Sequence, residues 1–183
     1  MEFETRRLII REFTPEDIGQ VHEYASDPAV VTHSIWGPNS LEDTGEYIRH
    51  TLILQQEEPR QGFEYAVVLK ENGLLIGGCG LHITGTGQGE IGYCYNRLYW
   101  GQGYATEAAA APLDLGFHKL ELHRIYATCR PENIGSARVM QKLGMTYEGH
   151  LRGHMYHKEK WMDSYQYSIL EEEYKGLRPR AGL

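Results

Sequence analysis

A short glycine-containing segment, Tyr99 to Ala108, most constrains how this chain folds. The residues before it, Glu90 to Tyr95, have the β-branched and aromatic character of a strand, and Glu107 to Ala111 are strong helix formers. Gly101 and Gly103 let the backbone approach a ligand closely, and the first free N–H groups of a helix attract anions. The segment therefore predicts a strand-to-helix loop that binds an anion.

This loop matches neither of the common nucleotide-binding motifs. No Gly-Lys-Ser/Thr follows it, as a P-loop requires, and Thr106 stands where a Rossmann fingerprint has its third small residue. A literal G-x-G-x-x-G does occur at residues 87–92. A strand pattern follows it, however, so it offers no helix N-terminus to a pyrophosphate.

Length, composition and charge indicate one globular domain. The chain has 183 residues, 41% of them hydrophobic and 23% charged, which suits a single domain with its own core. No apolar run is long enough to span a bilayer, and residues 1–6 lack the layout of a signal peptide. The net charge of −7 argues against a nucleic-acid-binding surface and mildly favours a cationic substrate. We expect one cytoplasmic domain over residues 1–183, without nucleic acid or membrane as a partner, and with a frayed tail over about 176–183.

Two sets of residues could suggest a metal site. The cysteines are odd in number, lack C-x-x-C spacing and lie in apolar runs: Cys79, Cys94 and Cys129. Three histidines have the spacing of ligands on a helix, but Gly153 and strand-like flanks argue against a helix there: His150, His154 and His157. We therefore expect buried free thiols, packing or solvent-facing histidines, and no metal.

The pattern along the chain predicts alternating strands and helices. Helix starts are marked by Thr14 and Ser40, each with an aspartate three residues on, and Asn72-Gly73 is typical of a type I′ hairpin turn. The expected strands are 5–12, 65–69, 74–79, 90–95, 124–129, 145–151 and 162–170, and the expected helices are 14–26, a second from 40, 103–119 and 133–143.

Four blocks of sequence occur in a familiar order. They are the opening Glu4 to Arg11, the glycine-containing loop, Arg130 to Ser136 followed by Lys142 to Met145, and Trp161 to Tyr165. Together they resemble the GNAT family of N-acetyltransferases, and within it the RimJ and RimL branch of ribosomal-protein N-terminal acetyltransferases. The resemblance implies an α/β fold, a central mixed sheet with two splayed strands flanked by helices. It also implies acetyl-CoA as co-substrate and direct attack of an amine on the bound thioester.

The resemblance implies which residues bind the coenzyme. The loop would hold its diphosphate, the strand before the loop would lie beside the thioester, and the start of a later helix would lie across from it. These residues are Tyr93, Cys94, Tyr95, Gly101, Gln102, Gly103, Tyr104, Ala105, Thr106, Asn133 and Ser136. A backbone N–H near Tyr93 to Tyr95 would bind the thioester oxygen. Leu98 stands where the family commonly has Gln or Arg, with Arg97 one place earlier, so a phosphate contact from Arg97 stays open.

Two residues are candidates for proton transfer. Glu90 stands where many relatives carry a catalytic glutamate, and the alternative is a solvated residue at a strand start. Many relatives carry a tyrosine as proton donor seven residues after the helix-start asparagine, but Met140 occupies that position here. The RimL branch has a serine three residues after the asparagine, here Ser136, and the alternative is that Ser136 satisfies backbone groups at the helix start.

Acceptor recognition rests on four residues in segments that line the acceptor pocket in relatives: His33, Trp36, Trp161 and Asp163. Aromatic walls with a carboxylate suit a cationic amine, although packing is the alternative for each residue. The resemblance favours a protein N-terminal amine as acceptor. A small-molecule amine, such as an antibiotic or polyamine, and a non-catalytic acetyl-CoA sensor are the alternatives. Relatives commonly associate through their last strands, which favours a homodimer.

Overall fold

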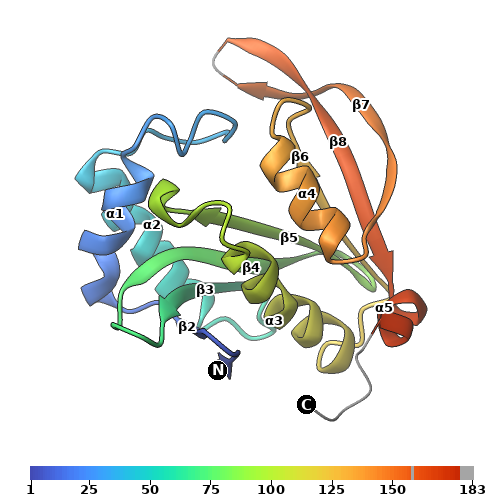
Figure 1. The fold of residues 1–183 in the computed structure, drawn as a ribbon, viewed down its shortest axis with the longest axis horizontal. Helices are drawn as coiled ribbons and strands as arrows, with labels where there is room; N and C mark the ends of the chain where they lie inside the picture. The colour runs from blue at the N-terminus through green and yellow to red at the C-terminus, as the bar shows by residue number, and fades with distance from the viewer. Residues whose placement is uncertain (158, 178–183) are drawn as a thin grey trace.

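The computed structural model describes residues 1–157 and 159–177. Its eight strands form one mixed sheet in the order β1-β2-β3-β4-β5-β6-β8-β7, with helices against it (Figure 1). The strands are β1 (Glu2–Glu4), β2 (Leu8–Glu12), β3 (Gly62–Leu69), β4 (Leu75–Gly85), β5 (Gln88–Tyr95), β6 (Arg124–Cys129), β7 (Thr146–His157) and β8 (Lys160–Leu170). The helices are α1 (Ile18–Ala25), α2 (Leu41–Leu54), α3 (Tyr104–His118), α4 (Ile134–Lys142) and α5 (Glu171–Leu177), with single 3₁₀ turns at Pro15–Asp17 and Arg97–Tyr99. The predicted mixed sheet flanked by helices is confirmed.

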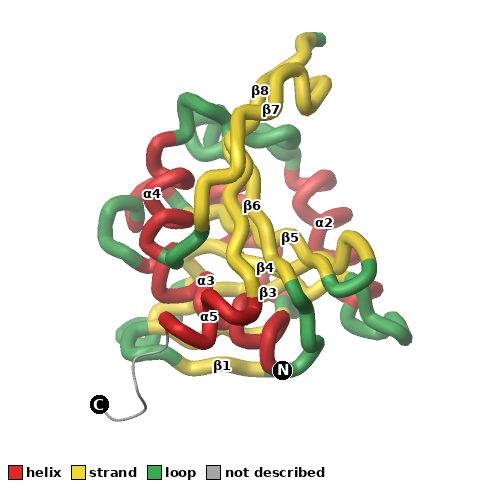
Figure 2. Tube along the Cα trace, turned by 90° about the vertical axis from the view of Figure 1, so that its right-hand side faces the viewer, coloured by secondary structure: helices red, strands yellow, loops and turns green. Residues whose placement is uncertain are grey.

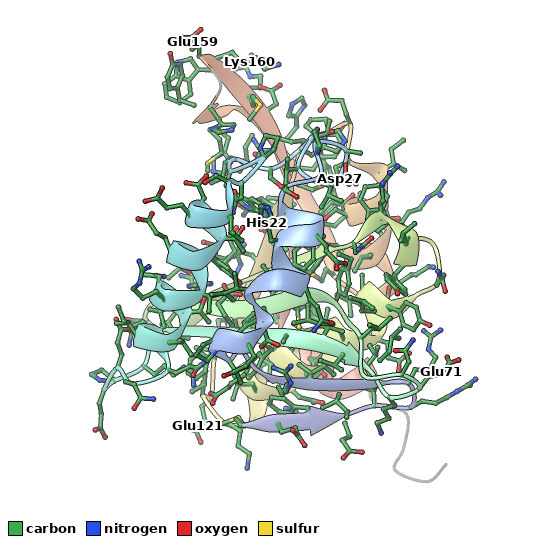
Figure 3. All side chains as sticks on the ribbon, turned by 90° about the vertical axis from the view of Figure 1, so that its left-hand side faces the viewer. His22, Asp27, Glu71, Glu121, Glu159 and Lys160 are labelled. Atoms are coloured by element: carbon green, nitrogen blue, oxygen red, sulfur yellow. The ribbon has the colours of Figure 1, made fainter. Side chains whose placement is uncertain are left out.

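The sheet buries side chains on both faces because successive residues of a strand point in opposite directions. On β3, Tyr65 and Val67 belong to the hydrophobic cluster that includes α3, and Ala66 and Val68 to the cluster that includes α1 and α2. Figure 3 views the face that α1 and α2 cover. None of the helices in the described part of the chain is long and apolar enough to cross a membrane.

The two halves of the sheet separate between β5 and β6. These strands are parallel and pair only at Gln88–Glu90 with Arg124–Tyr126, after which β5 stays with β4 and β6 stays with β8. Figure 1 shows the two strands diverging, so that a gap opens beside the second half of β5. The implied splay of the central strands is therefore present.

Helix starts follow the capping residues that the sequence contains. Ser40 accepts a hydrogen bond from the Asp43 N–H (3.1 Å), and Asp43 accepts one from the Ser40 N–H (2.8 Å). At the start of α4, the Asn133 side chain accepts from the Ser136 N–H at 3.1 Å. Both N-terminal caps were predicted, because an unpaired N–H in the first turn favours a side-chain acceptor at the cap.

Several expectations about local structure were wrong. The type I′ turn at Asn72-Gly73 is absent, because only Gly73 has a positive φ (72°) and the Leu69 N–H donates to Leu74 O, closing a longer loop. The strand expected from Thr5 begins at Leu8, and β1 and α5 were not predicted. Of the tail expected to fray, 176–177 belong to α5, and 178–183 lie outside the described residues.

The C-terminal hairpin of β7 and β8 extends beyond the rest of the protein (Figure 2). Its histidines lie on a strand, as expected, and two pair within the hairpin: His150 Nε2 lies 2.6 Å from Asp163 Oδ2, and His154 Nδ1 lies 2.8 Å from Ser164 Oγ. No cluster of three metal-ligating side chains occurs in residues 1–157 and 159–177.

Glu107, in the first turn of α3, ties this helix to the β1–β2 connection. Its carboxylate accepts from the Thr5 hydroxyl (2.6 Å), the Arg7 N–H (2.9 Å) and Arg7 Nε (2.7 Å). The Arg7 guanidinium also lies 4.2 Å from the centre of the Tyr104 ring and donates to Gln102 O at 3.1 Å. Thr5 and Arg7, in the connection between β1 and β2, thus hold the start of α3 and the loop before it in place.

We expect Glu107→Gln to lower the free energy of unfolding by about 1–3 kcal/mol, since a partly buried charge-assisted network is lost. Burial raises the pKa of Glu107, but the hydrogen bonds from Thr5 and Arg7 outweigh burial and hold the pKa below its usual 4.5. A lowered pKa stabilises the fold above the unfolded-state pKa, and this contribution disappears as the pH falls through the folded-state value. Denaturant titrations should therefore show a gap between the two proteins at pH 7 that narrows below pH 4.5. A gap that does not change with pH would contradict the assignment.

Candidate active site

The inner edge of β5 carries backbone groups that face the gap. The Asn96 N–H donates to Ile76 O on the β4 side, whereas Tyr95 O accepts from the Trp100 indole Nε1 at 2.8 Å. Because backbone groups alternate in direction along a strand, those of Tyr93 point the same way as those of Tyr95. β6 has diverged by this point, so the Tyr93 backbone groups are open to a ligand with amide groups.

The glycine loop (residues 99–106) has the geometry of an anion site. Gly101 and Gly103 have φ values of 74° and 83°, which side-chain-bearing residues rarely adopt. The first hydrogen bond of α3 runs from the Glu107 N–H to Gly103 O, so the N–H groups of Tyr104, Ala105 and Thr106 have no partner within the helix. Together with the helix dipole, these N–H groups fit the diphosphate of a coenzyme.

Ser136 and Tyr93 face each other across the gap. The Tyr93 hydroxyl lies 3.0 Å from Ser136 Oγ and donates to Ser136 O at 3.1 Å, which links β5 to the first turn of α4. Burial raises the pKa of Tyr93, and the hydrogen bond with Ser136 only partly offsets this, so the phenol stays protonated at neutral pH. Tyr93, predicted beside the thioester, and Ser136, predicted as a proton donor, therefore form one hydrogen-bonded pair.

A cavity of about 790 Å³ lies on the other side of β5, between the sheet and α1, α2 and the loop that joins them. This is an ordinary volume for a small-molecule site. Gly92, Tyr93 and Cys94 lie along one wall, which connects the cavity to the splayed strand. Its other lining side chains include three aromatic rings and three carboxylates: Tyr24, Trp36, Tyr47, Asp43, Glu46 and Glu64. We call it the acceptor cavity.

The helix α2 presents one polar stripe to this cavity. Asp43, Glu46, Tyr47 and His50 all line it, and their spacing of three, four and seven residues puts them on one helix face. That spacing is readable in the sequence as one polar face of a helix that begins near residue 40. The stripe gives the acceptor cavity an acidic wall.

Not every predicted site residue lies at the acceptor cavity. Trp36 lines it, whereas His33 does not. Trp161 and Asp163 are on β8 in the projecting hairpin, where the Trp161 ring lies tilted against the Tyr156 ring and Asp163 binds His150 and the Gly153 N–H. The expectation that these two residues line the pocket is therefore not met within this chain.

The remaining candidates have partners of their own. Glu90 accepts a hydrogen bond from Thr128 Oγ1 at 3.3 Å, at the point where β5 and β6 separate, and it is not among the residues lining the cavity. Arg97 Nε lies 2.7 Å from Asp27 Oδ2, so this side chain is engaged within the protein rather than held for a phosphate. Cys94 is only half-buried and lines the cavity, and burial raises its pKa to about 12, which keeps the thiol neutral.

Comparison with known proteins identifies the class to which this fold and site belong. The acetyltransferase (GNAT) domain matches residues 7–146, more than half of the chain. The uncharacterized N-acetyltransferase YnaD of Bacillus subtilis is 39% identical over 179 residues, which span 95% of this chain and 99% of YnaD. This protein therefore belongs to the GNAT family, and it is an acetyl-CoA-dependent N-acetyltransferase.

Solved structures agree with this fold. A GNAT-family acetyltransferase from Bacillus anthracis superposes with a TM-score of 0.84 at 39% identity, covering 94% of this chain and 99% of that one. More distant likenesses include a Vibrio cholerae spermidine N-acetyltransferase with CoA and spermine (20% identity, TM-score 0.79, 93% and 99% covered). A RimL ribosomal L7/L12 α-N-protein acetyltransferase with coenzyme A is similar at 18% identity (TM-score 0.81, 93% and 98% covered). These two likenesses carry the fold alone.

The glycine loop can be tested with a pair of matched substitutions. Gly101 and Gly73 have φ values of 74° and 72°, and a Cβ on either would meet no protein atom within 4 Å. We expect Gly101→Ala and Gly73→Ala to lower stability similarly, by about 1–2 kcal/mol, because both force alanine into the left-handed region. Only Gly101→Ala should also weaken coenzyme A binding, by about tenfold or more, because its methyl group stands where the ligand approaches. Isothermal calorimetry with coenzyme A measures this, and equal affinities for the two variants would contradict the loop's role.

Proposed function

We propose that this enzyme acetylates a primary amine of a small, multiply cationic acceptor, such as a polyamine or an amine-bearing antibiotic. The observation that carries the proposal is the set of carboxylates in the acceptor cavity: Asp43, Glu46 and Glu64. A carboxylate near each positive charge lowers the energy of a bound polycation, and the rings of Tyr24, Trp36 and Tyr47 add apolar and cation–π contacts. The cavity wall at Gly92 to Cys94 would bring one amine to the strand beside the thioester.

A protein N-terminal amine, which the sequence resemblance favours, is the second candidate. Its support is the set of four sequence blocks that resemble those of the RimJ and RimL branch. A protein N-terminus carries one charge and is followed by a polypeptide that must leave the cavity. The several carboxylates of the cavity suit a compact polycation better.

The coenzyme would be held by backbone groups and by two polar side chains. In this proposal the N–H groups of residues 101–106 bind its diphosphate, the open edge of β5 at Tyr93 binds its extended arm, and Asn133 and Ser136 lie opposite. Bound there, acetyl-CoA supplies an activated acetyl thioester. The N–H of Tyr93 is the donor that we assign to the thioester oxygen, because it faces the gap by strand alternation.

We assign the proton for the departing thiolate to the Ser136 hydroxyl. Tyr93 donates to Ser136 O, which fixes the first turn of α4 against β5 and holds Ser136 Oγ at the gap. Met140, which stands where many relatives carry a tyrosine, is fully buried and has no proton to donate.

We further propose that the protein is cytoplasmic and forms a homodimer. The three cysteines are free thiols, which supports a reducing compartment such as the cytoplasm. The rings of Tyr156 and Trp161 are largely exposed on the projecting hairpin, which supports its burial in a homodimer.

Acceptor choice can be measured by thiol release from acetyl-CoA with spermidine, 1,4-diaminobutane, kanamycin and peptides with Ser, Thr or Ala N-termini. We expect turnover of the polycations. Glu46→Gln should raise their KM several-fold, by about 0.5–1 kcal/mol of lost attraction, with little change in kcat. Glu42→Gln is the matched control, because Glu42 is on the same helix but does not line the cavity, and its KM should stay unchanged. Turnover of peptides alone would favour the second candidate.

The Ser136–Tyr93 pair can be tested by kinetics. Ser136→Ala should lower kcat by about 10²-fold or more, while coenzyme A binding measured by calorimetry changes little. Tyr93→Phe should lower kcat less, and the double variant should lose less than the product of the two single effects, because the hydroxyls act as one unit. Unchanged kcat in Ser136→Ala would overturn the assignment.

A further inference from the structure

Two titratable side chains with no role predicted from the sequence form a pair at the cavity. Glu64 is on β3 and lines the acceptor cavity, and His82 is on β4, on the same face of the sheet. His82 Nε2 lies 2.6 Å from Glu64 Oε1. The other carboxylate oxygen, Oε2, accepts a hydrogen bond from the Tyr47 hydroxyl at 3.3 Å. The carboxylate is thus held between α2 and the sheet.

Two glycines, Gly80 and Gly92, lie in line between this carboxylate and β5. Gly80 on β4 pairs with Glu64 on one side and with Gly92 of β5 on the other. A Cβ at Gly80 would lie 2.7 Å from Glu64 Oε2, so the carboxylate occupies the space that any side chain at Gly80 would need. A Cβ at Gly92 would meet nothing within 4 Å. The carboxylate therefore lies over β4. Next to it is the open space at Gly92 on β5, the strand that faces the gap.

His82 lies between this carboxylate and solvent. It is not among the cavity-lining residues, and 46% of its side chain is exposed. Glu90 is its cross-strand neighbour on β5. The titratable groups that the covering helices present to the cavity on this face are Tyr24 of α1 and Asp43, Glu46, Tyr47 and His50 of α2. A proton that reaches His82 from the cavity side can leave to water on the other side.

We propose that Glu64 accepts the proton that the acceptor ammonium must lose and that His82 passes this proton to solvent. This step rests on the proposed function, since it needs an amine in the acceptor cavity. An N–H bond of the ammonium breaks as an O–H bond forms on Glu64, and the freed electron pair makes the C–N bond. The C–S bond of the thioester breaks, and its electron pair leaves on the thiolate sulfur. The proton moves to His82 Nε2, which accepts it when the neutral ring carries its hydrogen on Nδ1. The Nδ1 proton then leaves to water, so that Glu64 is ionised again. The second proton lost by nitrogen replaces the one that Ser136 gives to the thiolate.

In this scheme Glu64 is the catalytic base. His82 is a positioning residue that acts through Glu64 by removing the proton from its carboxyl group. Glu90, the base expected from the resemblance, acts only through its charge on His82. The hydrogen bond to Glu64, with the charges of Glu64 and Glu90, raises the pKa of His82 above its usual 6.5, although burial opposes the shift. The pair can take up a proton only when His82 is neutral and Glu64 is ionised. Activity should therefore rise with pH through a value above 6.5.

The test compares pH profiles of kcat/KM for spermidine at saturating acetyl-CoA. We expect Glu64→Gln to lower kcat by about 10²–10⁴-fold, the range lost when a general base is removed. His82→Gln should lower kcat by about tenfold and abolish the ascending limb near neutrality. The amines of spermidine titrate at about pH 10, as a lysine does, so their titration affects every variant alike. The control is His150→Gln, which breaks a histidine–carboxylate pair of the same 2.6 Å length outside the cavity and should change neither value.

A second readout does not depend on turnover. The His82 ring resonance, followed by NMR in the protein without ligands, should titrate above 6.5 in the wild type and at a lower pH in Glu64→Gln. Calorimetry with coenzyme A should give the same affinity for all variants, which shows that they are folded. A wild-type enzyme that turns over no amine would overturn the proposed function, and the relay with it. Turnover with an unchanged pH profile in His82→Gln would overturn the relay alone.

Discussion

The separation of β5 from β6 is the constraint on which the rest of this structure depends. Three residue pairs join the strands, and beyond Glu90 each half of the sheet follows its own neighbours. A sheet interior normally satisfies every backbone group, so the open edge at Tyr93 is an expensive feature unless a ligand pairs with it. The glycine loop follows the same strand directly, which places an anion site and an open strand edge within one continuous segment. An extended ligand with a diphosphate at one end fits both.

The two faces of β5 divide the chemistry between them. On the side of α4, Tyr93 and Ser136 contribute neutral hydroxyl groups to the gap. On the side of α1 and α2, Glu64 belongs to an acidic cavity with open space beside Gly92. A thioester between the two would meet a proton donor on one side and a proton acceptor on the other. This arrangement suits a reaction in which nitrogen loses protons and sulfur gains one.

How much of this was predictable follows from the distance between partners along the chain. The glycine loop and the Asn133 cap are local, because each works through residues within a few positions, and the sequence predicted both. Tyr93 and Ser136 were predicted separately, but their contact depends on how α4 docks across the gap. Glu64 and His82 are 18 positions apart, and only the register of β3 on β4 brings them together. The prediction for Trp161 and Asp163 was not met for the same reason. The length of the hairpin, which places both residues away from the cavity, is not a local property of the sequence.

The most direct test of the central claim is a crystal structure of the enzyme with coenzyme A and spermidine bound together. The coenzyme arm should lie between β5 and β6, with its diphosphate on the N–H groups of residues 101–106. One spermidine nitrogen should lie within hydrogen-bonding distance of Glu64, and the remaining nitrogens should extend towards Glu46. Spermidine bound elsewhere, or a coenzyme arm that does not pair with the edge of β5 at Tyr93, would contradict the account.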